Sequence, residues 1–228
     1  MKKIVFALSL VCFSMNSHAQ INELGIVVGV INTITDIGST KYINPKDFGF
    51  GFQYRWNRSP RHSWRLNYSN LSISGADKDS DMAFRKARNY HFSNKIHEFS
   101  AGLEFNFFPF DLHNEWVGFT PYMHLGIAAI SYNESFFTND VQVKNDTYKF
   151  TPAVPFALGL KTQLRKRLVF SAEVGARYTF TDNLDGSHPG INALNFGNPT
   201  SNDWYMFTKI AITYTFGKNP CYCTPINF

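Results

Sequence analysis

The feature that most constrains the fold is an alternation of large apolar residues with small or polar ones at a period of two. From Phe48 to Trp56 every second residue is aromatic, and glycine, glutamine or arginine stands between them. Because successive side chains of a β-strand point to opposite faces, this segment predicts a strand with one aromatic face. A helix does not fit, since its apolar positions recur every three or four residues.

Seven other segments repeat this alternation, so the sequence predicts eight strands. The expected strands cover residues 24–30, 48–56, 64–69, 99–107, 121–129, 154–161, 170–180 and 206–216. In the third strand the phase slips near Asn70, which we interpret as a β-bulge. The links alternate in length. Residues 57–61 and 163–167 are tight and residues 108–118 moderate, whereas residues 33–46, 75–96, 133–151 and 181–203 form long polar links.

Together these features predict an all-β fold, an eight-stranded antiparallel transmembrane β-barrel of the OmpA-like type in the bacterial outer membrane. Such barrels have an even strand number, an apolar outer face, short periplasmic turns and long outer loops. Hydrocarbon offers no hydrogen-bond partner, so a sheet enters a bilayer only when it closes on itself. Aromatic residues make up 17% of the chain, and Trp56, Trp64, Tyr178 and Phe216 fit interfacial girdles. Both termini are then periplasmic.

The first nineteen residues have the features of a secretory signal peptide. Lys2 and Lys3 precede a short apolar run over residues 4–15, and small residues flank His18 before the expected cleavage after Ala19. We expect a signal peptide over residues 1–19, a barrel over residues 20–216 and a periplasmic C-terminal tail over residues 217–228. The formal charge is +5, two units of which belong to Lys2 and Lys3, so the charge does not indicate nucleic-acid binding.

A soluble barrel of the lipocalin type, or a β-sandwich, would instead bury the aromatic face. The less apolar face carries charges of both signs and several glycines, as a narrow polar lumen requires. The signal peptide, the girdle residues and the alternating link lengths favour the membrane barrel. The charged residues of this face are Glu23, Arg55, Arg65, Glu98, Glu104, Lys161, Glu173, Arg177 and Lys209.

An eight-stranded barrel is just wide enough for its own side chains to fill it, so we expect no diffusion pore. We interpret the inward charges as an ion-pair network in which each buried charge has a partner. The expected members of this network are Arg55, Arg65, Glu104, Lys161, Glu173, Arg177 and Lys209. His124, on the same face, is expected to be a hydrogen-bonded filler rather than a ligand.

A lipid-modifying enzyme of the outer membrane is a less favoured alternative. The sequence contains no Gly-x-Ser-x-Gly, no His-Glu-x-x-His and no phosphate-binding glycine loop, and its histidines lack the close spacing of a metal site. His97, near Ser100, is the one pairing that a hydrolase could use. We therefore expect no catalytic residue, no cofactor, no metal and no small-molecule substrate.

The second long link carries two charge blocks, Asp-Lys-Asp-Ser-Asp over residues 77–81 and Arg-Lys-Ala-Arg over residues 85–88. Such blocks are usually solvated loop. They could equally bind the anionic sugar phosphates of the outer leaflet, because Arg and Lys at that height meet phosphates. Neither interpretation predicts a specific ligand.

Several strings of residues resemble the PorG family, small outer-membrane barrels associated with type IX secretion in Bacteroidota. The likeness extends over most of the chain after residue 19. The strings are Thr35-Asp36-Ile37-Gly38, Tyr42-Ile43-Asn44-Pro45, Tyr54-Arg55-Trp56-Asn57, Ser59-Pro60-Arg61-His62-Ser63-Trp64-Arg65-Leu66, Asn106-Phe107-Phe108-Pro109-Phe110 and Phe119-Thr120-Pro121-Tyr122.

The resemblance implies an accessory, non-enzymatic role. A PorG-like barrel sits in outer-membrane lipid and associates with a periplasmic ring formed by a PorK-like lipoprotein and a PorN-like subunit. We would then expect contact through the periplasmic turns and the C-terminal tail, and the resemblance transfers no catalytic residue. The alternative is a general OmpA-like barrel with a structural or adhesive role.

The C-terminal tail contains Cys221 and Cys223, flanked by Pro220 and Pro225. The periplasm favours oxidised thiols, yet residues two apart in an extended chain are poorly placed for a mutual disulfide. A Cys-x-Cys pair alone also lacks two of the ligands of a structural metal site. We hypothesise that at least one of the two forms an intermolecular disulfide with a periplasmic partner, the ring lipoprotein above all. A local bridge or a free thiol is the alternative.

Overall fold

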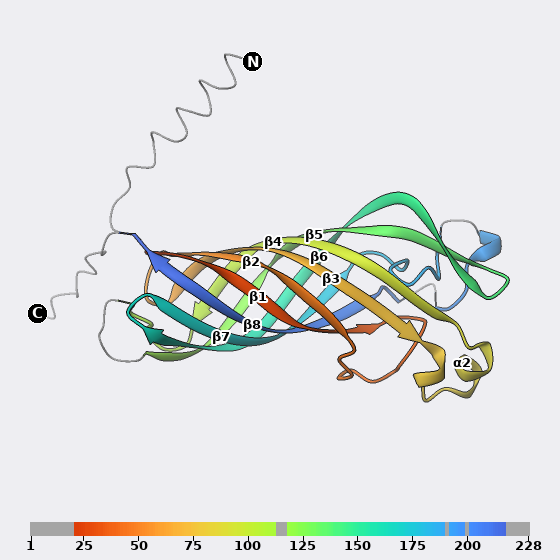
Figure 1. The fold of residues 1–228 in the computed structure, drawn as a ribbon, viewed down its shortest axis with the longest axis horizontal. Coiled ribbons are helices and arrows are strands. Elements are labelled where there is room, and N and C mark those ends of the chain that lie inside the picture. Colours follow the sequence, from red (N-terminus) through yellow and green to blue (C-terminus); the bar gives the residue numbers. More distant parts are fainter. Residues whose placement is uncertain (1–20, 113–117, 190–191, 199–200, 218–228) are drawn as a thin grey trace, which may run out of the picture.

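The chain forms a closed barrel of eight antiparallel strands in the computed structural model (Figure 1). The structure describes residues 21–112, 118–189, 192–198 and 201–217. The closed antiparallel barrel confirms the predicted fold class. The strands are β1 (Ile21–Ile34), β2 (Asp47–Asn57), β3 (His62–Ala76), β4 (His91–Asn106), β5 (Phe119–Thr138), β6 (Val141–Arg165), β7 (Leu168–Thr179) and β8 (Trp204–Phe216).

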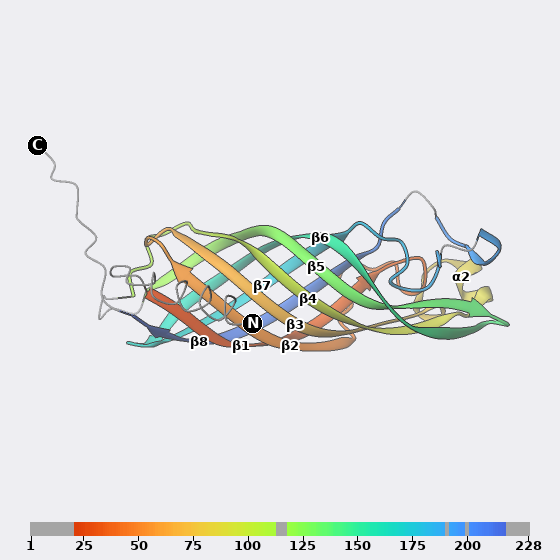
Figure 2. The same cartoon turned by 90° about the horizontal axis from the view of Figure 1, so that it is seen from above.

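Each strand pairs with the next one in sequence, and β8 pairs with β1 to close the sheet. The closing register runs from Asn22 opposite Phe216 to Ile34 opposite Trp204. Two views at right angles show the strands inclined to the long axis around the whole barrel (Figures 1 and 2). Closure pairs the backbone groups that an open sheet edge would expose, which is the condition for a sheet in hydrocarbon.

The two ends of the barrel differ in their connections. At one end, where β1 begins and β8 ends, residues 58–61 join β2 to β3 and residues 166–167 join β6 to β7. Backbone hydrogen bonds from Asn106 to Arg61 (2.8 Å) and from Phe110 to Pro60 (3.0 Å) link the first of these turns to the β4–β5 connection. We call this the turn end and the opposite one the loop end.

The expected loop over residues 133–151 is instead a continuation of β5 and β6, which project as a hairpin beyond the barrel (Figure 1). Ladder pairs run on to Thr138 opposite Val141, and Asn139 and Asp140 form the turn. Their φ angles of 50° and 65° are those that a type I′ hairpin turn requires. The polar composition of this segment therefore marks strands that leave the apolar belt, not a loop.

The bulge expected near Asn70 is absent from the described pairing of β3 with either neighbour. Inward and outward positions alternate without interruption from Ser63 to Ile73. The apparent slip arises because the inward side chains change from polar to apolar at Leu71. Register shifts occur instead in β5–β6 between Asn133 and Ser135, and in β6–β7 next to Gln163.

The lumen is filled by three layers of side chains. At the turn end Phe110, Leu112 and Val169 form a small apolar cluster, which we call the turn-end plug. Buried charged residues occupy the middle of the barrel. Toward the loop end lies the apolar layer, formed by Val27, Ile31, Ile37, Leu71, Ile73, Phe92, Ile96, Ala128, Ile130, Tyr132, Phe137, Ala153, Leu184, Tyr205, Phe207 and Ala211.

The connections at the loop end are folded. They contain the short helices η1 (Asp77–Asp79), α2 (Ala83–Arg88) and η2 (Asn192–Leu194). The β7–β8 connection turns back over the barrel mouth and inserts Leu184, which is fully buried in the apolar layer. Within the described ranges, no helix is long and apolar enough to cross a membrane.

Candidate functional site

The outward face of the barrel is a belt of exposed apolar side chains. On β5, Ile127 is 73% exposed whereas its inward neighbour Ala128 is 6% exposed. Soluble monomers rarely expose a continuous apolar surface of this extent. The belt includes Leu24, Ile26, Phe50, Phe52, Leu66, Phe99, Leu103, Leu125, Ile127, Leu158, Val174, Ile210 and Ile212.

Aromatic pairs mark both borders of this belt. Trp56 lies opposite Trp64 near the turn end, while the rings of Tyr178 and Trp204 meet edge to face at 4.9 Å near the loop end. The stretch of β8 between Trp204 and Tyr214 spans about 25 Å along the barrel axis, taking about 3.3 Å per residue and a tilt of about 40°. That height matches the apolar band of an outer-membrane barrel. The protein is a bacterial outer-membrane β-barrel.

A connected network of ion pairs and hydrogen bonds crosses the middle of the lumen, and every strand contributes to it. Its members are buried, and Arg55, Arg65 and Glu104 have no exposed area at all. We call this set the luminal network. It consists of Glu23 (β1), Arg55 (β2), Arg65 (β3), Glu104 (β4), Tyr122 (β5), Lys161 (β6), Glu173 (β7) and Lys209 (β8).

Two carboxylates lie at the centre of the luminal network. Glu104 accepts hydrogen bonds from Arg55 Nε and Arg65 Nη1, both at 3.1 Å, and from Lys161 Nζ at 2.6 Å. Arg65 also bonds Glu173 at 2.7 Å, and Lys209 Nζ lies 3.1 Å from the same carboxylate. Each of these charges therefore has oppositely charged partners, which offsets the cost of removing it from water.

Arg177, one of the seven predicted network members, contacts a different acid. Its Nε donates to Glu98 at 3.4 Å, and the hydroxyl of Tyr205 donates to the same carboxylate. The Arg177 guanidinium lies over the ring of Phe207 at 5.3 Å, beside the apolar layer. The other six predicted residues belong to the luminal network, together with Glu23 and Tyr122. The hydrogen bonds expected for His124 are absent among the described residues, because neither ring nitrogen has a partner there.

Three residues of the charge blocks of the β3–β4 connection, Asp77, Arg85 and Arg88, make internal contacts instead of facing solvent. Asp77 is fully buried and accepts hydrogen bonds from Arg88 at 2.7 Å and from the backbone of Gly38 at 3.0 Å. Arg85 donates to the carbonyl of Thr35 at 3.0 Å, and Arg88 donates to that of Asp36 at 2.8 Å. The β3–β4 connection thus holds the β1–β2 connection in place through these hydrogen bonds. Lys78, Asp81 and Lys86 remain exposed.

The first, second and fourth loop-end connections, which join β1 to β2, β3 to β4 and β7 to β8, enclose a pocket of about 860 Å³. Its lining includes Asp36, Arg85, Asp182, Asp203 and Trp204. Three carboxylates therefore face one cavity that also has an aromatic wall. No sequence motif indicated this pocket.

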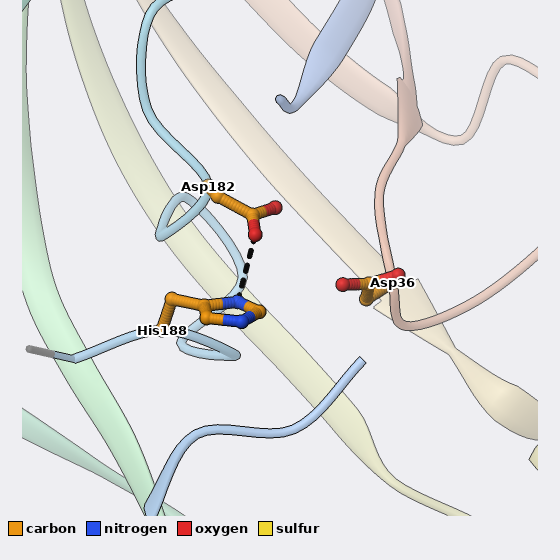
Figure 3. A group of neighbouring side chains, drawn as sticks. All are labelled: Asp36, Asp182 and His188. Carbon is orange, nitrogen blue, oxygen red and sulfur yellow. Dashed lines mark ion pairs between the residues drawn. The ribbon is translucent and has the colours of Figure 1, made fainter. Parts of the chain in front are cut away.

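Asp36 and Asp182, which line this pocket, form with His188 the described group of three potential metal-ligating side chains. One ligand atom from each of Asp36, Asp182 and His188 lies within 4.8 Å of the other two. Figure 3 shows Asp182 and His188 side by side on the β7–β8 connection, with Asp36 facing them from the connection after β1. We call these three residues the outer-mouth cluster. Spacing along the sequence gave no sign of it, because its members come from connections far apart in the chain.

Carboxylates crowd the outer-mouth cluster. Burial, together with the nearby charges of Asp36 and Asp185, raises the pKa of Asp182 to about 7. Burial and the charge of Asp185 also hold the pKa of Asp203 well above its usual range. Each cause named here opposes ionisation, so these acids raise the free energy of one another's charged form.

His97 and Ser100 do not form the hydrolase-like pair that their proximity suggested. Ser100 is buried in the lumen, whereas His97 lies on the outward side and its Nδ1 is 3.1 Å from the hydroxyl of Tyr68. An odd number of residue steps along a strand places the two side chains on opposite faces. Cys221 and Cys223 lie outside the described residues, as do the expected signal peptide and nearly all of the expected tail.

A family model described as a domain of unknown function, DUF6089, matches residues 2–225. The chain belongs to the DUF6089 family. No curated protein matches the sequence. The family assignment covers nearly the whole chain but names no activity.

Solved structures with a similar shape are outer-membrane proteins of low sequence identity. The attachment invasion locus protein Ail of Yersinia pestis is 12% identical, with a TM-score of 0.45, and the match covers 88% of this chain and 100% of that chain. The N-terminal β-barrel domain of Pseudomonas aeruginosa OprF is 10% identical, with a TM-score of 0.44, covering 87% of this chain and 98% of that one. Neisserial surface protein A is 9% identical, with a TM-score of 0.46, covering 86% and 97%. The fold of the present chain rests on its own strand pairing.

Proposed function

We propose that this DUF6089 barrel is a closed, non-enzymatic membrane anchor that serves as an accessory component of type IX secretion, contacting a periplasmic ring through its turn end. The observation that carries the anchoring role is the filled lumen. The turn-end plug, the luminal network and the apolar layer succeed one another along the axis. A barrel of this kind holds a position in the membrane and offers its two ends to partners.

The location of the PorG-like strings supports contact at the turn end. The strings over residues 54–57 and 59–66 flank the β2–β3 turn, and the strings over residues 106–110 and 119–122 flank the β4–β5 connection. Hydrogen bonds already described join these two connections to each other. Four of the six strings therefore lie at the turn end, which the proposal assigns to the periplasm.

The turn end is also basic. Exposed cations lie in or beside both short turns. They are close to the aromatic border of the apolar belt, because the guanidinium of Arg58 lies over the ring of Trp56 at 5.9 Å. A surface of this charge is suited to an acidic partner, because complementary charges steer association and set orientation. The cations are Arg58, Arg61, Arg165, Lys166 and Arg167.

Deletion of the gene, followed by an assay for secretion of type IX cargo, tests the proposal. We expect cargo to accumulate in the cells and the full-length gene to restore its release. Normal secretion in the deletion strain would remove the secretion role and leave a general structural barrel. Purified protein in a planar bilayer should in addition give no steady conductance, and a stable open channel would contradict the closed anchor.

A charge-reversal pair locates the contact. The double variant Arg58→Glu with Arg165→Glu should impair restoration of secretion, because it places two acids on the turn end. The matched control, Lys41→Glu with Lys86→Glu, makes the same change in charge at exposed positions of the loop end. Equal restoration by both variants would rule out recognition of the basic turn end.

A further inference from the structure

The outer-mouth cluster joins two connections that the barrel strands leave separate. Asp36 follows β1, whereas Asp182 and His188 precede β8. The backbone N–H of Asn198 donates to Oδ2 of Asp36 at 2.9 Å and so orients that carboxylate. Gly197 makes this approach possible, because a Cβ there would lie 2.1 Å from Oδ2 of Asp36 and its φ of +91° strains any other residue.

The contact between Asp182 and His188 is not a completed hydrogen bond. Nδ1 of His188 lies 2.8 Å from Oδ2 of Asp182, at an ion-pair distance. That oxygen is nonetheless buried and accepts no hydrogen bond from the described residues. A carboxylate oxygen and an imidazole nitrogen this close together can both ligate one cation; the same nitrogen also lies 3.1 Å from the hydroxyl oxygen of Ser187. This observation is independent of the number of acids nearby.

The balance of charge around the cluster points to the same kind of ligand. Asp185 and Asp203 lie behind it, both buried, so that two further acids face Asp36 and Asp182. Arg85 forms a long ion pair with Asp36, at 3.8 Å. Arg88, the other arginine at the pocket, is engaged by Asp77 at 2.7 Å. Acidic side chains thus outnumber basic ones around the cluster among the described residues.

We propose that Asp36, Asp182 and His188 bind one divalent transition-metal ion, with Zn²⁺ as the best match, and that the ion ties the first loop-end connection to the fourth. One imidazole nitrogen with two carboxylate oxygens is a donor set that Zn²⁺ accepts, whereas Ca²⁺ and Mg²⁺ prefer oxygen alone. Asp36 and Asp182 also line the pocket, so a further ligand can reach the ion from that side. The site is independent of the secretion role proposed above.

Calorimetric titration of the purified, folded chain in detergent with ZnCl₂, after treatment with a chelator and dialysis, tests the site. We expect one Zn²⁺ per chain, and His188→Gln or Asp182→Asn should weaken binding by at least about tenfold, since each removes one of three protein ligands. The matched control His91→Gln removes an exposed histidine of the same end and should bind like the parent. Parent-like binding by His188→Gln would mean an adventitious ion only and overturn the proposal, as would the absence of binding.

A second measurement uses the parent protein alone and so does not depend on whether a variant folds. X-ray absorption of the Zn²⁺ complex should show one imidazole per metal together with oxygen ligands. A spectrum without imidazole scattering, or with two or more imidazoles per metal, would overturn the assignment.

Discussion

The luminal network and the outer-mouth cluster are both groups of charged side chains in one small barrel, but they are built in opposite ways. In the luminal network each carboxylate lies against arginine or lysine, as Glu104 does against three cations. At the outer mouth, Asp182 lies near other acids, Asp36 and Asp185 among them. The luminal network needs no further group, because its charges already have oppositely charged partners, and we interpret it as structural. The acids of the outer mouth lie near one another, so binding of a proton or a cation there lowers their mutual repulsion.

The largest effect should come from breaking the luminal network. Glu104→Ala removes the acid that Arg55, Arg65 and Lys161 share, all three of them buried, and we expect a loss of about 3 to 5 kcal/mol in the free energy of unfolding. Glu134→Ala is the matched control, because the side chain of its partner Lys149 is 44% exposed and pairs open to solvent contribute about 0 to 1 kcal/mol. Urea unfolding in lipid vesicles, followed by tryptophan fluorescence, measures both. Equal losses would show that the network does not stabilise the barrel.

The apolar layer should be nearly as sensitive, although it carries no charge. Leu71→Ala removes a fully buried side chain and leaves a cavity, at a cost of about 2 to 5 kcal/mol. Leu66→Ala, on the outward side of the same strand, should cost less because lipid fills the vacated space. A larger loss for Leu66 than for Leu71 in the same unfolding assay would contradict the assignment of the two faces.

Removal of an acid at the outer mouth should stabilise the protein locally, whereas removal of an acid from the luminal network should destabilise it. Asp203→Asn removes a buried acidic group that lies among other carboxyl groups, while the amide oxygen can still accept the hydrogen bond from the Leu184 N–H, now at 2.8 Å. We expect slower amide exchange across residues 181–189 in the metal-free variant at pH 8. Faster exchange than in the parent would mean that the Asp203 charge is favourable there.

The smallest effect is the pH dependence of the same connection. The pKa of Asp182 rises from 3.8 to about 7 on folding. Its contribution to stability is therefore complete below about pH 4 and is lost as the pH rises through about 7. In the presence of a chelator, exchange of the β7–β8 connection, corrected for the intrinsic rate, should be faster at pH 8 than at pH 5. The reverse order would contradict the raised pKa.

The barrel could be predicted from sequence because its information is local. The alternation within each strand identifies its inward and outward faces. Counting every second residue places Arg55 and Glu104 on the inward face. The same counting failed at Asn70. From Leu71 onward the inward side chains of this strand are apolar, so the sequence no longer distinguishes them from lipid-facing ones. The counting also treated residues 133–151 as a loop, because strands surrounded by water on both sides lose their apolar alternation.

The outer-mouth cluster was beyond prediction for a different reason. Asp36 and Asn198, which hold one corner of it, are 162 residues apart. A single aspartate in a polar link carries no signal until the fold brings its partners to it. The pairing of the luminal charges was likewise hidden, since counting along the strands assigned Arg177 to the same network as Glu104 and Glu173, whereas it contacts Glu98.

Closure of the sheet by β8 has a consequence for the order of assembly. Thr213 and Lys209, both on this last strand, contact Glu23 and Glu173, and the contact with Glu23 spans 190 residues. Until the last strand joins the first, these acids lack part of their compensation and the sheet has two open edges. Ring closure and compensation of Glu23 by Thr213 then coincide in a contact of high sequence separation, which predicts that closure is slow compared with the pairing of neighbouring strands.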